Sequence, residues 1–290
     1  MVWCSGAKLA SACSRAGALG LVGCGSMRPD LFREQLREMP AGLPWGVNLP
    51  IFYKYADDCA QILLDEGVKI VFTSAGNPKK YTATFKARGL TVVHVVATAA
   101  QAVKCEAAGC DAVVAEGFEA GGHNGPDELT TMVLTRLVVK AVRIPVIAAG
   151  GIADGHGMAA ALALGAAGVQ VGSRFAVTQE SSAHDAYKQA VASAGEADTV
   201  LALKAIGPAR FLKNGYYDLV KAAEARCATP DELRELAPPG RTRRGIHEGD
   251  TALGELEVGQ VAGLIEDVPT AAEVVARLVA EYQAAKAALP

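Results

Sequence analysis

One histidine of this 290-residue chain lies in a glycine-rich segment that directly follows an apolar run. The segment reads Glu116-Gly-Phe-Glu-Ala-Gly-Gly-His-Asn-Gly125, so the residues around His123 give its imidazole little steric cover. Imidazole is the side chain best suited to take a proton near neutral pH. We therefore expect His123 to be a catalytic base, although a lone histidine is more often a structural residue. His94 lies within an apolar run and is expected to be such a structural, interior histidine.

Two more turns that contain glycine follow later apolar runs. One turn holds Gly150-Gly151, and the other reads Gln170-Val171-Gly172-Ser173. Backbone N–H groups in such turns can point at an anion, and barrel enzymes use this arrangement to bind phosphate. The sequence thus predicts a phosphate site, the alternative being that these glycines only permit tight turns.

Several familiar site motifs are absent from the sequence. The chain has no G-x-G-x-x-G dinucleotide motif, no G-x-x-x-x-G-K-[ST] phosphate loop and no G-x-S-x-G nucleophile elbow. No group of histidine, cysteine and acidic residues has the spacing of a metal site, so we expect no bound metal. A phosphate site together with an exposed base points to a phosphate-bearing cofactor or a sugar phosphate.

The elements that must position these residues are short apolar runs, which recur at intervals of 21 to 33 residues. The runs are continuously apolar rather than alternating, which indicates parallel strands covered on both faces. They comprise Leu19–Gly25, Gly46–Pro50, Lys69–Ala75, Thr91–Val96, Ala112–Gly117, Pro145–Gly151 and Gly168–Phe175. Helical patterns lie between them, at Tyr55–Glu66, Pro78–Arg88, Ala99–Ala107, Met132–Val142 and Gly157–Leu164. The pattern predicts an α/β fold, either a (β/α) barrel or a doubly wound sheet.

An eight-stranded barrel needs one strand more than these seven runs supply. The chain opens with a helix-like segment, Gly6–Ala16, that no strand precedes. We therefore expect the first barrel strand to lie upstream of Met1. Leu21–Cys24 also resembles the end of a lipoprotein signal, but Arg15 interrupts the apolar stretch before it, which favours a buried strand.

The pattern of alternating strands and helices ends near Phe175. We expect residues 1–182 to form the barrel and residues 183–258 to form a helical lid without strands. The predicted lid helices are Ala183–Ala194, Tyr216–Ala225 and Thr229–Leu236. Residues 259–290 are expected to return to the barrel through a C-terminal helix with Thr270 as its N-cap and Glu273 three residues later.

The composition excludes several classes of protein. Apolar residues make up 51% of the chain and charged residues 20%, which provides a large core and excludes disorder. The formal charge of −3, without a basic block, argues against nucleic acid or an anionic membrane surface as a partner. No stretch is long and apolar enough to span a membrane. The seven cysteines form no C-x-x-C pair, which indicates reduced thiols in a cytoplasmic protein.

The three glycine-bearing segments together resemble those of the nitronate monooxygenase (2-nitropropane dioxygenase) family, which includes the flavin-dependent enoyl-ACP reductase II. Matching segments cover nearly the whole chain: Gly46–Leu49, Thr73–Pro78, Glu116–Gly125, Pro145–Gly155, Gln170–Phe175, Glu180–His184 and Gly259–Gly263. The resemblance implies a TIM (β/α)8-type barrel that binds FMN. It also implies a first strand and a Gln-Gly-Gly turn before Met1, in agreement with the strand count.

The resemblance further implies a role for individual residues. Asn48, Glu116, Gly121 and Gly122 would contact the flavin, and His123 would be the catalytic base. The phosphate would be held by Gly150, Gly151, Gln170, Val171, Gly172 and Ser173. Many nitronate monooxygenases carry Gln where this chain has Glu116, whereas the reductases commonly have Glu there.

Two reactions follow from the resemblance. A nitronate monooxygenase would oxidise alkyl nitronates with O2, and His123 would abstract the proton next to the nitro group or bind the anion. An enoyl-[acyl-carrier-protein] reductase II of fatty acid biosynthesis would instead use NAD(P)H to reduce FMN and then an enoyl thioester. Asn124 places a polar amide beside the base, which suits a small nitronate better than an acyl chain and favours the first reaction.

A third interpretation is a flavin- or phosphate-binding barrel without turnover, because a fold does not determine a function. The expected partners are a small-molecule substrate and, as an option, a second copy of the chain in a homodimer.

Overall fold

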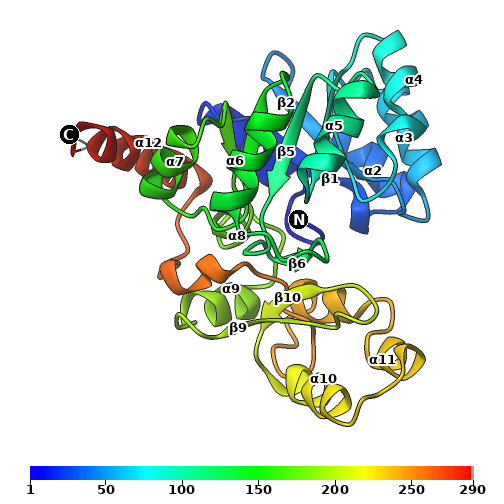
Figure 1. Ribbon diagram of the computed structural model, residues 1–290, viewed down its shortest axis with the longest axis vertical. Helices are drawn as coiled ribbons and strands as arrows, with labels where there is room; N and C mark the ends of the chain where they lie inside the picture. The colour runs from blue at the N-terminus through cyan, green and yellow to red at the C-terminus, as the bar shows by residue number, and fades with distance from the viewer. Residues whose placement is uncertain (289–290) are drawn as a thin grey trace.

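Seven parallel strands form the main sheet of the computed structural model, which describes residues 1–288. The strands are β1 (Gly20–Gly23), β2 (Trp45–Pro50), β3 (Ile70–Ser74), β4 (Thr91–Val96), β5 (Ala112–Glu116), β7 (Val146–Ala149) and β8 (Gly168–Gln170). They follow one another in this order and curl as in a TIM-type barrel, with β1 and β8 as the edges within the described residues (Figure 1). The seven predicted strands are confirmed, although the last ends at Gln170 rather than at Phe175.

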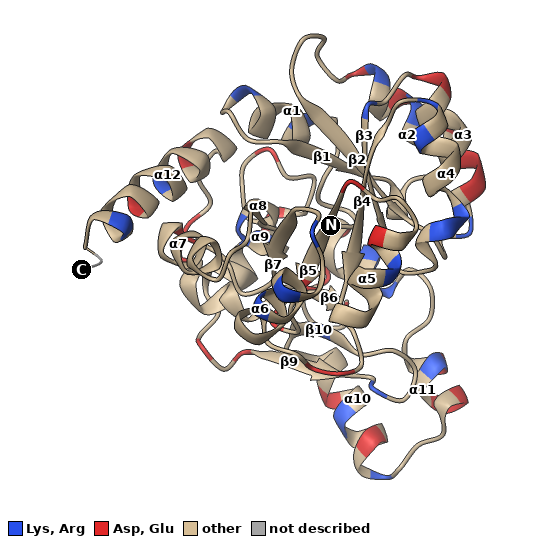
Figure 2. Cartoon of the chain, turned by 45° about the horizontal axis from the view of Figure 1, so that its top comes forward, with Lys and Arg blue, Asp and Glu red and all other residues tan. Residues whose placement is uncertain are grey.

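Helices connect the strands and cover the outside of the sheet. They are α1 (Ala7–Arg15), α2 (Pro29–Arg37), α3 (Ala56–Asp65), α4 (Thr82–Ala87), α5 (Ala99–Ala107), α6 (Thr131–Ala141), α7 (Gly155–Ala163) and α8 (Ser173–Ala176), with short turns η1 (Cys24–Ser26) and η2 (Pro78–Lys80). Helix α2 was not predicted, although Pro29 at its first position is a common start signal. Charged residues of both signs lie on these helices, whereas the strands are almost free of them (Figure 2).

The apolar runs are continuous because the strands are buried on both faces. Successive residues alternate between two clusters: Val71, Val92 and Val113 pack outward against the helices. Their neighbours Phe72, Val93 and Val114 pack inside the curled sheet. Each strand therefore needs an apolar side chain at nearly every position, which is the pattern read from the sequence.

A second sheet was not predicted. Its strands are β6 (Gly122–His123), β10 (Ala209–Leu212) and β9 (Thr199–Ala202), which pair antiparallel in that order. The expectation of a lid without strands is therefore wrong. Two of these strands have four residues and one has two, so none is long enough to show a clear period, and β6 lies far from its partner in sequence.

The predicted helices of the same segment are confirmed. They are α9 (Asp185–Ala192), α10 (Gly215–Ala225) and α11 (Pro230–Leu236), and they are followed by the short turns η3 (Arg243–His247) and η4 (Gln260–Leu264). Thr229 and Glu232 form the reciprocal capping box at the start of α11. In Figure 1, α10 and α11 lie with β9 and β10 below the barrel.

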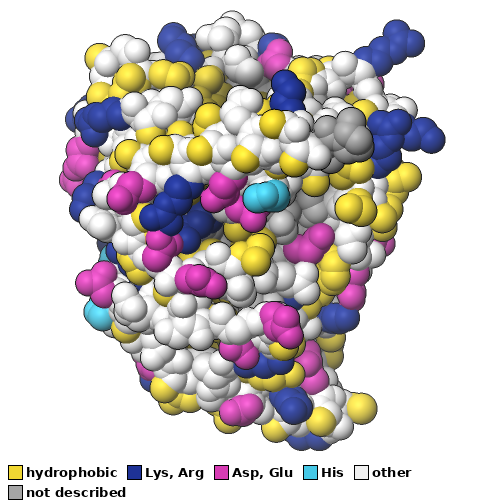
Figure 3. All heavy atoms as spheres, turned by 90° about the vertical axis from the view of Figure 1, so that its left-hand side faces the viewer, with side chains coloured by type: hydrophobic (Ala, Val, Ile, Leu, Met, Phe, Trp, Pro, Cys, Tyr) yellow, Lys and Arg dark blue, Asp and Glu magenta, His cyan; other side chains and the backbone are white. Residues whose placement is uncertain are grey.

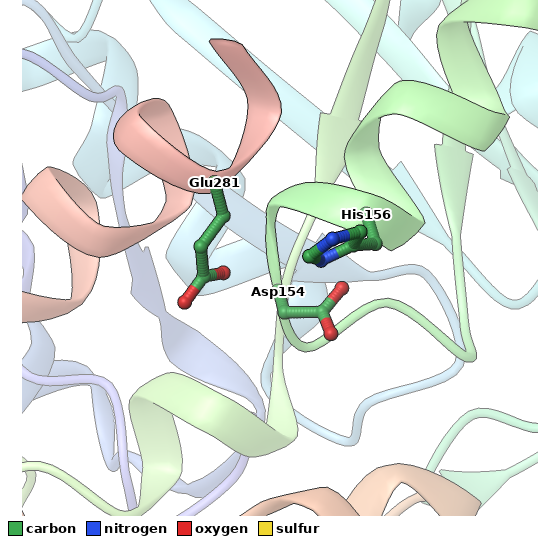
Figure 4. Close-up of side chains that lie close together, drawn as sticks. All are labelled: Asp154, His156 and Glu281. Atoms are coloured by element: carbon green, nitrogen blue, oxygen red, sulfur yellow. The ribbon is translucent and has the colours of Figure 1, made fainter. Parts of the chain in front are cut away.

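The C-terminal helix α12 (Ala271–Ala288) lies beside α7 (Figure 1). Glu281 of α12 accepts a hydrogen bond from the Gly155 backbone N–H at 2.9 Å, and Asp154 accepts one from the Gly157 N–H at 2.8 Å. Figure 4 shows these two carboxylates close to His156. Because both carboxylates bind N–H groups of the first turn of α7, we interpret the group as the contact that docks α12 on α7.

Three global features agree with the composition. No helix of the described residues is long and apolar enough to cross a membrane. On the face shown in Figure 3, Lys and Arg side chains are interspersed with Asp and Glu side chains. The cysteines are free thiols, and all of them are buried except Cys227.

The close approach of α12 to α7 leads to a stability prediction. A β-carbon at Gly155 would lie 2.5 Å from the Leu278 carbonyl oxygen and against the Tyr282 backbone nitrogen. Gly155→Ala should therefore lower the free energy of unfolding by about 1–3 kcal/mol, measured by urea unfolding. Gly157→Ala is the control, since its nearest neighbours would be at an ordinary 3.5 Å. Equal unfolding midpoints for the two variants would contradict the close helix contact.

Candidate active site

All the residues predicted to bind cofactor or substrate line one cavity of about 2700 Å³. It includes the carboxyl ends of the parallel strands, where barrel enzymes place their chemistry, and extends inside the curled sheet to the amino ends of β1, β7 and β8. Ligand sites commonly measure about 300–1,000 Å³, so this cavity has room for a cofactor and a substrate together. The predicted residues found there are Asn48, Glu116, Gly121, Gly122, His123, Gly150, Gly151, Gln170, Val171, Gly172 and Ser173.

The turns after β7 and β8 present free backbone N–H groups to this cavity. Gly150 and Gly151 have positive φ angles of 85° and 64°, which residues other than glycine rarely adopt. Among the described residues, none accepts a hydrogen bond from the N–H groups of Gly151, Gly172 or Ser173. The Ser173 hydroxyl accepts a hydrogen bond from the Gly259 N–H at 2.8 Å and keeps its own hydrogen free. This arrangement can bind a phosphate group.

Gln170 carries a second unsatisfied group at the same place. Its side-chain oxygen Oε1 is buried and receives no hydrogen bond from the described residues. Buried polar atoms are rarely left unpaired, so an N–H group of a ligand is the expected partner. A planar, phosphate-bearing cofactor with ring N–H groups would fit both observations.

Asn48 and Glu116 lie at the ends of β2 and β5 and differ in their surroundings. The Asn48 amide donates to the Phe72 carbonyl at 3.1 Å and to the Ser74 hydroxyl at 3.4 Å, which fixes its orientation. The Glu116 carboxylate accepts no hydrogen bond from the described residues, and burial raises its pKa to about 7. Glu116 can therefore exist in either protonation state near neutral pH.

His123 reaches the cavity from the second sheet. Its backbone pairs with Ala209 of β10, and its side chain is 72% exposed. The next residue, Asn124, donates both hydrogens of its amide to the carbonyls of Ala120 and Gly122, at 3.0 and 2.9 Å. Both amide hydrogens of Asn124 therefore brace the loop that carries the imidazole, while the residue itself lines the cavity beside His123.

Two acidic residues of the site were missed by sequence reasoning. Glu119 accepts hydrogen bonds from the Thr131 N–H at 2.9 and 3.0 Å and from the Thr131 hydroxyl at 3.0 Å, so it ties the loop after β5 to the start of α6. Glu257 lies 3.7 Å from His123, measured from Oε1 to Nδ1. Burial raises the pKa of Glu257 and of the nearby Glu255 to about 7 each. Only the position of Glu119 within the glycine-rich segment could have drawn attention to it.

His94 is the interior histidine expected from the sequence. It is buried, and its Nδ1 lies 2.7 Å from the Thr73 hydroxyl oxygen, a hydrogen-bond distance. Burial lowers its pKa to about 4, so the ring is neutral at physiological pH. It is thus a structural link between β3 and β4, and its ring also lines the cavity.

The buried Glu116 leads to a prediction about pH. Its folded pKa of about 7 lies above the value of 4.5 for a free side chain, so the folded state binds the proton more tightly between these two values. As pH rises through this window, the wild type should lose stability relative to Glu116→Gln. The loss should be at most about 3 kcal/mol, reduced by water in the cavity.

Urea unfolding of both proteins at about pH 5 and about pH 8 measures this difference. The lowered pKa of His94 affects the stability of both proteins equally, so it does not contribute to the difference between them. The control is Glu34→Gln, which removes an exposed carboxyl on α2. If the difference in free energy of unfolding between the wild type and Glu116→Gln does not change with pH, Glu116 is solvated rather than buried.

Comparison with known proteins agrees with this geometry. The sequence profile of the family described as nitronate monooxygenase matches residues 47–281. The (3aS,4S,5R,7aS)-5-hydroxy-7a-methyl-1-oxo-octahydro-1H-indene-4-carboxyl-CoA dehydrogenase of Mycobacterium tuberculosis is 32% identical, over 96% of this chain and 90% of that protein. The structure of FabK from Thermotoga maritima aligns with a TM-score of 0.94 and 41% identity, over 99% of this chain and 92% of that one. The nitroalkane oxidase of Streptomyces ansochromogenes aligns with a TM-score of 0.84 and 28% identity, over 99% and 95% of the two chains. This chain therefore belongs to the nitronate monooxygenase family of oxidoreductases.

Proposed function

We propose that this chain is an FMN-dependent nitronate monooxygenase that oxidises small nitroalkanes or their nitronate anions with O2. The observation that carries the proposal is that the exposed imidazole of His123 lines the same cavity as the free N–H groups of Gly151 and Gly172. The family match and the similarity to a nitroalkane oxidase support this reaction.

The residues around the cavity fit FMN better than FAD. The N–H groups of Gly151, Gly172 and Ser173 would hold its single phosphate, and Gln170 Oε1 would accept a hydrogen bond from the ring. Asn48, Glu116, Gly121 and Gly122 line the remaining wall and would face the ring system. No dinucleotide fold is present among the described residues to hold an adenosine half. When bound, FMN would supply the transfer of electrons from substrate to O2.

His123 would act as the general base on a neutral nitroalkane. The exposed ring can approach a small molecule in the cavity without moving the backbone. It would take the proton from the carbon next to the nitro group, a role for which imidazole is suited near neutral pH. With a nitronate anion, which has already lost this proton, His123 would serve only to bind and orient.

The alternative function is reduction of an enoyl thioester with NAD(P)H as reductant. The name of the Mycobacterium tuberculosis relative describes a coenzyme A derivative, which favours a thioester substrate. Asn124 does not separate the two functions, because its amide binds the loop backbone. Consumption of NAD(P)H that requires an enoyl thioester, without turnover of either nitro compound, would replace the first function by the second.

Cofactor binding provides the first test. Gly172→Asp places a negative charge among the free N–H groups, and we expect it to weaken FMN binding at least ~10²-fold through charge repulsion and loss of the anion site. Thr91→Asp carries the same charge on an exposed residue at the start of β4, outside the cavity lining, and should bind FMN normally. Quenching of FMN fluorescence on titration measures the FMN affinity of both variants. Equal affinities, or release of FAD from the purified protein, would contradict the phosphate site.

Base catalysis provides the second test. His123→Asn should lose at least ~10²-fold in turnover of a neutral nitroalkane, which requires deprotonation, and much less with the pre-formed nitronate. Flavin content should be unchanged, because the variant leaves the turns after β7 and β8 intact. Oxygen consumption measures the turnover of the variant relative to the wild type with each of the two substrates. Full activity of the variant on both would show that the imidazole takes no part in the reaction.

A further inference from the structure

A buried carboxylate lies directly beside the exposed imidazole of His123. Glu257 Oε1 is 3.7 Å from His123 Nδ1, and the Glu257 side chain is only 11% exposed. No described residue donates a hydrogen bond to this carboxylate; the Tyr187 hydroxyl donates instead to the Glu257 backbone carbonyl at 2.7 Å. Among the described residues, His123 is the one that forms an ion-pair contact with this carboxylate.

The backbone brings these two residues together. Phe211 of β10 forms an antiparallel bridge with Glu257, and Ala209 of the same strand pairs with His123. Since β9 occupies the other edge of β10, the Glu257 segment and β6 share one edge. The Leu212 N–H donates to the Leu256 carbonyl at 3.0 Å and fixes the register.

Gly122 permits the close approach of the carboxylate. It has a φ angle of 75°, and a β-carbon there would lie 3.2 Å from both Cδ and Oε2 of Glu257. A larger residue would push the carboxylate away from the ring of His123. Gly122 therefore leaves space for the Glu257 carboxylate beside His123, in addition to exposing the imidazole.

We infer that Glu257 is a positioning residue for His123, an inference that rests on the proposed function. Its carboxylate accepts the Nδ1–H of the neutral ring after a small side-chain rotation, which leaves Nε2 bare and directed at the substrate. When the substrate C–H bond breaks, its electron pair stays on the substrate as the nitronate, and the proton forms an N–H bond at Nε2. The adjacent carboxylate then stabilises the imidazolium.

Glu255 provides a matched control. It lies two residues before Glu257 and is also largely buried, but its carboxylate accepts a hydrogen bond from the Thr242 hydroxyl at 3.3 Å. Glu255→Gln and Glu257→Gln therefore remove the same charge from the same segment, but only Glu257→Gln neutralises the carboxylate beside His123. Because glutamine keeps an oxygen that can accept a hydrogen bond, Glu257→Leu is the variant that also removes the acceptor.

The first experiment measures kcat and KM of the flavin-loaded proteins with a neutral nitroalkane and with its pre-formed nitronate. Glu257→Gln should lower kcat for the nitroalkane by ~10–100-fold, as is typical for residues that orient a reacting side chain, with little change for the nitronate. It should have no further effect in a His123→Asn background. Equal losses on both substrates, or effects that multiply in the double variant, would show a merely structural role for Glu257.

The second experiment needs no substrate, so it distinguishes failure of this inference from failure of the proposed function. With 15N-labelled histidine, NMR assigns the tautomer of His123, whose signal is identified by its loss in His123→Asn. The wild type and Glu255→Leu should carry the hydrogen on Nδ1, whereas Glu257→Leu, which has no acceptor at this position, should shift the population towards Nε2–H. An unchanged tautomer in Glu257→Leu would overturn the inference, even if the enzyme oxidises nitroalkanes.

Discussion

The antiparallel pairing of β6 with β10 is the interaction on which the candidate active site depends. It joins two residues of a barrel loop to a strand about 90 positions later, and so places His123 over the carboxyl ends of the main sheet. Neighbouring contacts strengthen it, since Arg210 donates to the Phe118 carbonyl at 3.0 Å and the Asn124 N–H donates to the Pro208 carbonyl at 2.9 Å. The loop after β5 and the second sheet therefore form one unit, and a change in either should move the imidazole.

Much of the barrel could be predicted because its physical cause is local. Each strand faces helices on one side and the barrel interior on the other, so its apolar residues are continuous, as in Ile70–Ser74 and Thr91–Val96. The glycine-bearing turns after β7 and β8 were also visible in the sequence, and the positive φ angles of Gly150 and Gly151 explain why glycine occupies the first of them.

The second sheet and the carboxylate beside the histidine could not be predicted in the same way. A two-residue strand has no period, and the bridge from Phe211 to Glu257 joins segments with no sequence pattern in common. Asn124 illustrates the same limit: its residue type indicates a polar group beside His123, but not that its amide hydrogens bind the carbonyls of Ala120 and Gly122. Which acceptors a polar side chain finds is decided by the tertiary structure.

Buried carboxyl groups distinguish this cavity from an ordinary apolar pocket. Burial raises the pKa values of Glu116, Glu255 and Glu257 to about 7, so each is less stable in its charged form than it would be in water. Such groups reduce the stability of the fold above neutral pH, and perturbed carboxyl groups that cluster in a cleft are typical of functional sites. In the cavity lining, Glu257 lies beside His123, whereas the free N–H groups of Gly151 and Gly172 lie in the turns after β7 and β8.

The proposed function is tested most directly by anaerobic mixing of the FMN-loaded protein with propyl nitronate, NADH and NADPH in separate experiments, followed by the visible absorbance of the flavin. We expect rapid bleaching by propyl nitronate and recovery of the absorbance when O2 is admitted. Rapid bleaching by NADH or NADPH, with none by the nitronate, would contradict the proposed function and assign the cavity to a nicotinamide-dependent reductase.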